Sequence, residues 1–186
     1  MKKLLIALVA LAMTTIANAT IIKISVNGVV DPPIYLFPSE TAIIGIHVTD
    51  NTGWPSGGIG GFVVIQGAGS IVIPEPPELY LWEQSTINKA NLPEPYDTYK
   101  TYLEPTYPGI TDILEFEIKD TSIPITLPLG RVIDGLMFHC DALGDVVLTV
   151  IDLDLNVFDS QVLHQVPEPM TLALLGLGGL FLRRRK

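Results

Sequence analysis

Apolar and polar residues alternate with a period of two along much of the chain between residues 20 and 165. The alternation is clearest over 22–27, 41–48 and 114–119, where every second residue is aliphatic or aromatic. A period of two places apolar side chains on one face of a β-strand and polar ones on the other. Helical periodicity is almost absent here. We therefore predict an all-β fold, an antiparallel β-sandwich of about seven to nine strands over residues 20–165.

Two long apolar runs, 131–140 and 144–155, lie close together near the end of this region. They are separated by turn residues between Asp141 and Gly144. Two strands joined by so short a turn are typical of a β-hairpin. We expect these two strands to pair, with Asp152 and Asp154 on the solvent-facing side where the second strand ends.

The segment 74–108 breaks the strand rhythm. It is rich in proline and carries six acidic residues and five tyrosines. Proline excludes central strands and interrupts helices, so we expect a long insertion between two halves of the sandwich, with at most one short helix over 78–89. Loops of this length are usually functional or disordered. The insertion is therefore the best candidate for a recognition surface.

Aromatic residues in turns and in the insertion are the candidate ligand contacts. Exposed rings stack on sugars and also anchor protein interfaces. The alternative is that the rings fold back over one sheet and give the insertion a small core. The candidate residues are Trp54, Tyr80, Trp82, Tyr96 and Tyr99.

The charge of the chain argues against nucleic acid as a partner. The formal net charge is −9, and six of the 11 basic residues lie near the two ends. The segment 20–166 holds five basic residues against nineteen acidic ones, which leaves it at about −14. Phosphate binding relies on clustered Lys and Arg, which this segment lacks.

Catalytic constellations are not evident in the sequence. The single cysteine, Cys140, lies in an apolar strand pattern and is expected to be a buried structural thiol. His47, His139 and His164 are far apart, so we expect no metal triad. No nucleophile elbow is present. We expect a protein that is not an enzyme.

One stretch begins like a calcium-binding loop. Asp152, Asp154 and Asn156 have the spacing of its first three ligands, but Val157 and Leu163 stand where such a loop needs glycine and a carboxylate. We predict no cofactor. The alternative left open is a weak calcium site that uses Asp152 or Asp154 with Asp141 or Asp145.

The N-terminus has the three parts of a secretory signal peptide. Lys2 and Lys3 are followed by an apolar stretch from Leu4 to about Met13 and by small residues at Ala17 and Ala19. This layout predicts export and cleavage by signal peptidase after Ala19. Residues 1–19 are therefore assigned to the signal peptide.

The C-terminus also has three ordered parts. Pro167, Glu168 and Pro169 precede an apolar run, 170–182, and the basic cluster Arg183, Arg184, Arg185 and Lys186. A spanning helix needs about 20 apolar residues, so the run is short for one. Residues 166–186 resemble the PEP-CTERM sorting signal. The resemblance implies a short C-terminal hydrophobic helix, an inner-membrane intermediate and processing near Pro-Glu-Pro by an exosortase-type enzyme.

The middle of the chain resembles a second group of proteins. The stretch GIGGFVVIQGAGSIV, followed later by GLMFHCDALGDVVLTVIDLD, is similar to cohesin-like and carbohydrate-binding-module-like sandwiches. This resemblance implies a non-catalytic interaction domain, which the sorting signal would deliver to the cell envelope surface or the extracellular matrix. The alternatives are a carbohydrate-binding module for exopolysaccharide and, least favoured, a secreted hydrolase. The sequence names neither a ligand nor an oligomeric state.

Overall fold

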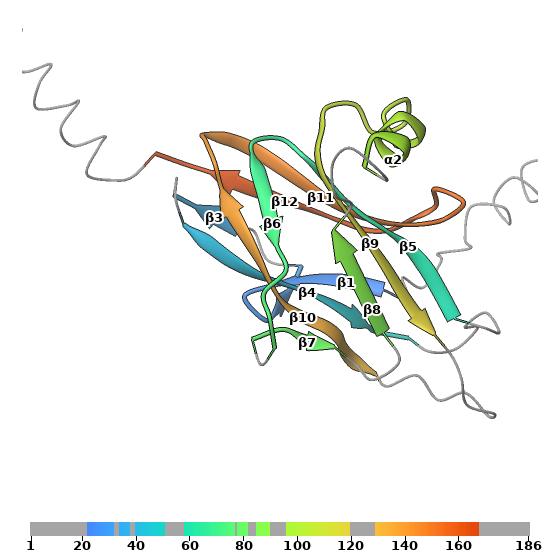
Figure 1. The fold of residues 1–186 in the computed structure, drawn as a ribbon. Helices are drawn as coiled ribbons and strands as arrows, with labels where there is room; N and C mark the ends of the chain where they lie inside the picture. Colours follow the sequence, from blue (N-terminus) through green and yellow to red (C-terminus); the bar gives the residue numbers. More distant parts are fainter. Residues whose placement is uncertain are drawn as a thin grey trace, which may run out of the picture.

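The computed structural model describes residues 22–31, 34–37, 40–50, 58–76, 78–81, 85–89, 96–119 and 129–167. Within them, two six-stranded sheets pack face to face (Figure 1). The predicted β-sandwich is confirmed. Sheet A has the order β2 (Val29–Val30), β1 (Ile22–Val26), β4 (Thr41–Val48), β10 (Gly130–Cys140) and β6 (Gly69–Val72), with β7 (Tyr80–Leu81) also paired to β10. Sheet B has the order β3 (Ile34–Leu36), β12 (Val157–Gln165), β11 (Gly144–Asp152), β5 (Gly58–Gln66), β9 (Ile110–Lys119) and β8 (Ser85–Lys89).

Nearly all strand pairs among the described residues are antiparallel, as the alternating pattern predicts. The exception is β3, which runs parallel to β12 at the edge of sheet B. Of the twelve strands described, β2, β3 and β7 have only two or three residues, which leaves nine longer ones. The prediction of about seven to nine strands corresponds to these longer strands.

The main core lies between the two sheets. Along β4 the inward residues Ala42, Ile44, Ile46 and Val48 are each about 1% exposed. They face the apolar side of sheet B, including Leu148 and Val150 of β11. The period-two pattern read from the sequence is thus the pattern of core contacts, and burial of these side chains is the main stabilising contribution to the fold.

The predicted hairpin between 131–140 and 144–155 is wrong. Strand β10 pairs with β4, β6 and β7 in sheet A, whereas β11 pairs with β12 and β5 in sheet B. The three residues between them cross from one sheet to the other. Each strand already has a partner on both sides, so neither has a free edge for the other. The tight hairpin at this end of the sequence is instead β11–β12.

The insertion contributes to both sheets rather than standing apart from them. Its residues form β7 and β8, at positions where we expected at most a helix over 78–89. Ser85 and Ile87 point inward and Thr86 outward, which is strand alternation. The helix lies later, as α2 (Tyr96–Leu103). Both strands sit at sheet margins, which is where a proline-rich segment can pair.

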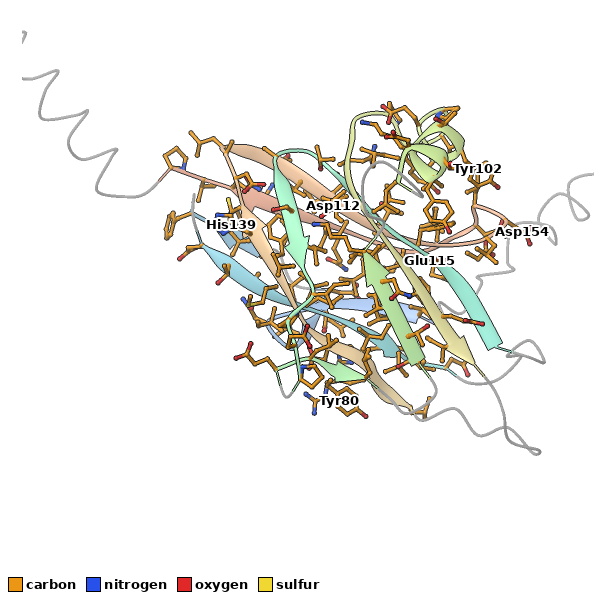
Figure 2. All side chains as sticks on the ribbon, viewed as in Figure 1. Tyr80, Tyr102, Asp112, Glu115, His139 and Asp154 are labelled. Carbon is orange, nitrogen blue, oxygen red and sulfur yellow. The ribbon has the colours of Figure 1, made fainter. Side chains whose placement is uncertain are left out.

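The two sheets are tied together near both edges of sheet A by an aspartate of sheet B that is paired with a lysine. Asp159 of β12 accepts a hydrogen bond from Ile24 N at 2.8 Å and pairs with Lys23 at 3.4 Å. Asp112 of β9, at the centre of Figure 2, accepts one from Ile71 N at 3.0 Å and pairs with Lys89 at 2.8 Å. The carboxylates satisfy backbone donors that an edge strand would leave open.

Helix α2 and the residues after it cover the outer face of sheet B (Figure 1). None of the helices in the described part of the chain is long and apolar enough to cross a membrane. The predicted signal peptide, with Ala17 and Ala19, the apolar run 170–182 and the basic cluster Arg183–Lys186 lie outside the described residues.

Candidate functional site

The structure separates the candidate aromatic residues into different environments. Trp54 and Trp82 lie outside the described residues, as does the side chain of Tyr96 at the start of α2. Tyr80 is 44% exposed on β7, and the Arg131 guanidinium lies 5.5 Å from its ring centroid. Figure 2 shows Tyr80 on the side of the molecule away from α2. Tyr80 is thus an accessible ring held by a cation–π contact.

Tyr99 has a structural role. Its ring centroid lies 4.9 Å from that of Phe62 on β5, and it packs on a second core formed by the outer face of sheet B. Leu103, one turn later on α2, is fully buried in the same cluster. Burial and the neighbouring Glu115 carboxylate raise the pKa of Tyr99, which keeps the phenol neutral. The insertion therefore builds a small core with part of its aromatic content.

Tyr107 and Tyr102 reach over the turn between β11 and β12. The Tyr107 hydroxyl donates to Leu155 O at 3.3 Å, and the Tyr102 hydroxyl donates to Leu153 O at 3.4 Å. Tyr107 is half-buried, but Tyr102 and Leu153 are 53% and 57% exposed. We call Tyr102, Leu153 and the exposed Asp154 the turn surface; Figure 2 shows Tyr102 and Asp154 at the same end of the sandwich.

Asp152 organises the turn between β11 and β12 through its carboxylate. Its carboxylate accepts hydrogen bonds from Asp154 N at 2.9 Å, Asn156 N at 2.7 Å and Asn156 Nδ2 at 2.8 Å. Leu155 takes the left-handed conformation, with φ of 65°, to close the turn. The expectation that Asp152 and Asp154 continue a strand is therefore wrong beyond Asp152.

The alternative calcium site does not assemble. Asp145 begins β11 and Asp152 ends it, so about 23 Å of extended strand separates the two carboxylates. Asp141 precedes Asp145 and lies at the same end of the strand. Among the residues that the structure describes, no three His, Cys, Asp or Glu side chains gather in a way that could hold a metal ion.

Cys140 is a buried structural thiol, as the sequence indicates. It is 1% exposed in the main core, and its thiol points at Ala142 O, 3.7 Å away. Burial raises its pKa, and the carboxylates of Asp141 and Glu40 act in the same direction. A thiol held in this way is a poor nucleophile.

Sequence reasoning missed a serine–histidine pair on the outer face of sheet A. Ser25 Oγ lies 2.8 Å from His47 Nε2. Gly45 leaves room for this pair, since a Cβ there would lie 2.8 Å from Ser25 Oγ and 2.9 Å from Asp134 Oδ1. Burial lowers the pKa of His47, so the ring is neutral at pH 7. Ser25 is fully buried, however, and a substrate carbonyl cannot reach its oxygen.

Sequence reasoning also missed an exposed aromatic surface beside the C-terminal end of β12. Tyr35 of β3 is 65% exposed and stacks on His164, with ring centroids 5.3 Å apart. His164 Nδ1 lies 2.8 Å from Asp145 Oδ1, and Val162 is exposed on the same face. We call Tyr35, Asp145, Val162 and His164 the motif-side surface. The signal was present in the sequence, because Tyr35 is the outward position between Ile34 and Leu36.

The motif-side surface adjoins the start of the C-terminal segment. Val166 N donates to Leu36 O at 2.9 Å, and the next residue, Pro167, is exposed. Figure 1 shows the end of β12 and the β11–β12 turn on opposite sides of the sandwich. Glu168 and Pro169 lie outside the described residues.

A family model for the PEP-CTERM protein-sorting motif matches residues 165–186. No curated protein matches the chain. The motif confirms the resemblance predicted for the C-terminus, beginning one residue earlier than expected. It indicates an exported protein that is sorted to the cell envelope by an exosortase.

Several solved structures with some similarity to the chain are cohesin modules or their complexes. A chain of a type I cohesin–dockerin complex from Clostridium thermocellum is 10% identical, with a TM-score of 0.40, over 78% of this chain and 99% of that one. A chain of the complex of the sixth cohesin of scaffoldin B from Acetivibrio cellulolyticus with a Cel5 dockerin is 9% identical, with the same TM-score and coverage. The cohesin module of a family 33 glycoside hydrolase from Clostridium perfringens is 10% identical, with a TM-score of 0.36, over 81% of this chain and all of that one.

These neighbours are of the kind that the middle of the sequence resembles. At TM-scores of 0.36 to 0.40 the likeness carries no conclusion about partners or activity. The conclusion that stands is that this chain joins a two-sheet β-sandwich directly to a PEP-CTERM protein-sorting motif.

Proposed function

We propose that this protein is an exosortase-sorted component of the cell surface or extracellular matrix whose sandwich is a non-catalytic protein-interaction domain. In this scheme, signal peptidase removes residues 1–19, and the apolar run 170–182 holds the chain in the inner membrane. An exosortase-type enzyme then processes it near Pro167-Glu168-Pro169. The sorting motif is the observation that supports this route.

The turn surface is the observation that carries the interaction role. Tyr102 and Leu153 are both more than half exposed and lie at the end of the sandwich opposite the motif. When the C-terminal run is held at the membrane, this end points away from it. Tyrosine beside an exposed aliphatic residue is typical of interface anchors.

The site chemistry supports binding rather than catalysis. Ser25, which lies beside His47, and Cys140 are both buried. The acidic surface carries exposed carboxylates such as Asp154, which favour a partner with basic side chains. We therefore rank a protein partner above a hydrolysed substrate.

Site-specific photo-cross-linking in the native cell tests this proposal. A cross-linking residue at position 153 should capture a discrete partner, and Tyr102→Ala should reduce that capture several-fold. A cross-linker at Val29, which is 53% exposed in sheet A, is the matched control and should not capture the same species. Equal capture at both positions would contradict the proposal.

The alternative is a carbohydrate-binding module for the cell's own exopolysaccharide, and Tyr80 favours it. A ring that is 44% exposed and fixed by Arg131 is a suitable platform for the apolar face of a sugar. Binding to purified exopolysaccharide that is lost in Tyr80→Ala, Trp54→Ala or Trp82→Ala would support this alternative. No binding by the wild-type chain would remove it.

A further inference from the structure

Strand β12 continues into the sorting motif without a linker. Gln165 is paired with Leu36, and its side-chain Nε2 donates to Ala68 O at 2.9 Å. Val166 is held by the hydrogen bond to Leu36 O, and Pro167 follows at once. The motif match begins at residue 165, so its first residues are part of the sandwich.

This continuity places a protein that binds Pro167-Glu168-Pro169 close to the sandwich. An extended chain advances about 3.3 Å per residue, so the three residues of Pro-Glu-Pro span only about 10 Å. A stable protein interface buries about 800 Å² on each partner, which is more than three residues offer. The surface of the sandwich next to Pro167 lies within reach of the processing enzyme and can enlarge the contact made by the motif.

The motif-side surface is the solvent-exposed part of the sandwich next to Pro167. Tyr35 is paired with His164 in the parallel β3–β12 register, and His164 is paired with Asp145 across β11–β12. These three side chains lie in a row on one face of sheet B, and His164 is three residues before Pro167. The stacked ring and the hydrogen bond at 2.8 Å hold Tyr35 and His164 in fixed orientations before any partner binds.

The charge at this end defines the complementary chemistry. Asp145 is 64% exposed, Asp141 is 46% exposed and lies 3.8 Å from His139, and the exposed Glu40 sits near Cys140. Figure 2 shows His139 at this end of the molecule, opposite Tyr102. A partner face with basic side chains beside an apolar or aromatic pocket fits this end, where Asp145 lies in a row with the exposed Tyr35 and further carboxylates lie near Cys140.

We propose that the motif-side surface is a second recognition element for the enzyme that processes the sorting motif. The enzyme binds Pro167-Glu168-Pro169 in its active site and receives Tyr35 and Asp145 on a basic, aromatic-accepting face beside it. The sandwich then contributes to substrate selection together with the terminal segment. This inference rests on the proposed sorting route and adds a determinant to it.

Pulse–chase labelling of the full chain in its native cell tests the inference, with conversion of the precursor followed by mass spectrometry of its C-terminus. Tyr35→Ala and Asp145→Lys should each slow conversion by about tenfold, the size expected for an interface anchor. The matched controls are Leu129→Ala, at 63% exposure and at the other end of β10, and Glu75→Lys. Both should convert at the wild-type rate.

A second variant does not disturb the sandwich. Inserting about twelve Gly/Ser residues between Val166 and Pro167 separates the motif from the surface by about 20 Å on average. Processing should slow if the two are recognised together. Wild-type rates in this variant and in Tyr35→Ala would overturn the inference.

The experiment distinguishes failure of the proposed sorting route from failure of this inference alone. If the wild-type chain keeps Lys186, or if a Pro167→Ala, Glu168→Ala, Pro169→Ala variant is processed normally, the proposed route fails and the inference fails with it. If the wild type is processed, the motif variant is not, and the Tyr35→Ala and linker variants match the wild type, only the inference fails.

Discussion

The turn end of the sandwich packs two tyrosines onto sheet B and exposes a third, Tyr102, whereas Tyr35 at the motif end is exposed. At the turn end, Tyr99 and Tyr107 are packed onto the outer face of sheet B, and Tyr107 is hydrogen-bonded to the β11–β12 turn. At the motif end, Tyr35 stands 65% exposed on a short edge strand beside the sorting motif. The tyrosine-rich insertion thus combines the packed Tyr99 and Tyr107 with the exposed Tyr80 and Tyr102, whereas Tyr35, outside it, is the most accessible ring among the described aromatic residues.

Packed tyrosines therefore stabilise the fold, whereas exposed tyrosines are available for recognition. A half-buried ring that contacts a core contributes apolar burial, and its removal leaves a cavity. A ring on an open strand face contributes little to folding and is available to a partner. The following substitutions test that division, from the largest expected effect to the smallest.

Replacement of Pro167, Glu168 and Pro169 together by alanine should nearly abolish C-terminal processing. In the proposed route the processing enzyme recognises these three residues, and the sandwich ends one residue before them. Mass spectrometry of the accumulated protein should find the precursor ending at Lys186. Leu129→Ala should be processed normally, and equal processing of both would contradict the role assigned to the motif end.

Leu103→Ala should lower the free energy of unfolding by about 2–5 kcal/mol, because a fully buried side chain is removed from the second core under α2. Tyr35→Ala should change it by no more than about 0.5 kcal/mol, as for other exposed positions. Urea unfolding of the full chain measures both. A Tyr35→Ala cost as large as that of Leu103→Ala would make Tyr35 a core residue and remove the contrast.

Asp152→Ala should lower the free energy of unfolding by about 1–3 kcal/mol, because three hydrogen-bond donors in the β11–β12 turn lose their acceptor. Asp154 supplies an exposed side chain to the same turn and is the matched control. Thermal unfolding should show a clear loss for Asp152→Ala and almost none for Asp154→Ala. Melting temperatures that shift only when calcium is added would instead point to a metal site.

Raising the pH above 10 should weaken the turn end through Tyr107. Burial and the Asp152 carboxylate raise the pKa of Tyr107 above its usual 10.0. The unfolded phenol therefore ionises first, so the stability contributed by the neutral phenol is complete below pH 10 and is lost as the pH rises further. In Tyr107→Phe the free energy of unfolding should fall less steeply above pH 10 than in the wild type. Identical slopes would contradict this account.

Local patterning predicted the sandwich, because burial in a two-sheet fold imposes a period of two on each strand. Ile22, Ile24 and Val26 alternate with polar residues in the sequence and face the core in the structure. Pairing between strands was less accessible to sequence reasoning. The sequence of the turn from Asp141 to Gly144 is compatible with a hairpin and with a crossing between sheets. The crossing occurs because β4 and β6 occupy the two edges of β10, and β5 and β12 occupy those of β11.

The candidate site was predicted in part. The C-terminal motif was evident because its recognition depends on residue order alone. Which tyrosines are buried was not evident, because burial depends on what lies opposite each ring. Tyr99 packs against Phe62 of sheet B, while the outward side chain of Tyr35 stacks on His164 of its own sheet. The Ser25–His47 contact was also out of reach, since the two residues meet diagonally across paired strands.

Mass spectrometry of the mature protein from its native cell tests the account most directly. The account predicts an N-terminus near Thr20, after signal peptidase cleavage at Ala19, and a C-terminus that lacks the basic cluster ending at Lys186. A mature protein that retains both Met1 and Lys186 would contradict export and sorting together.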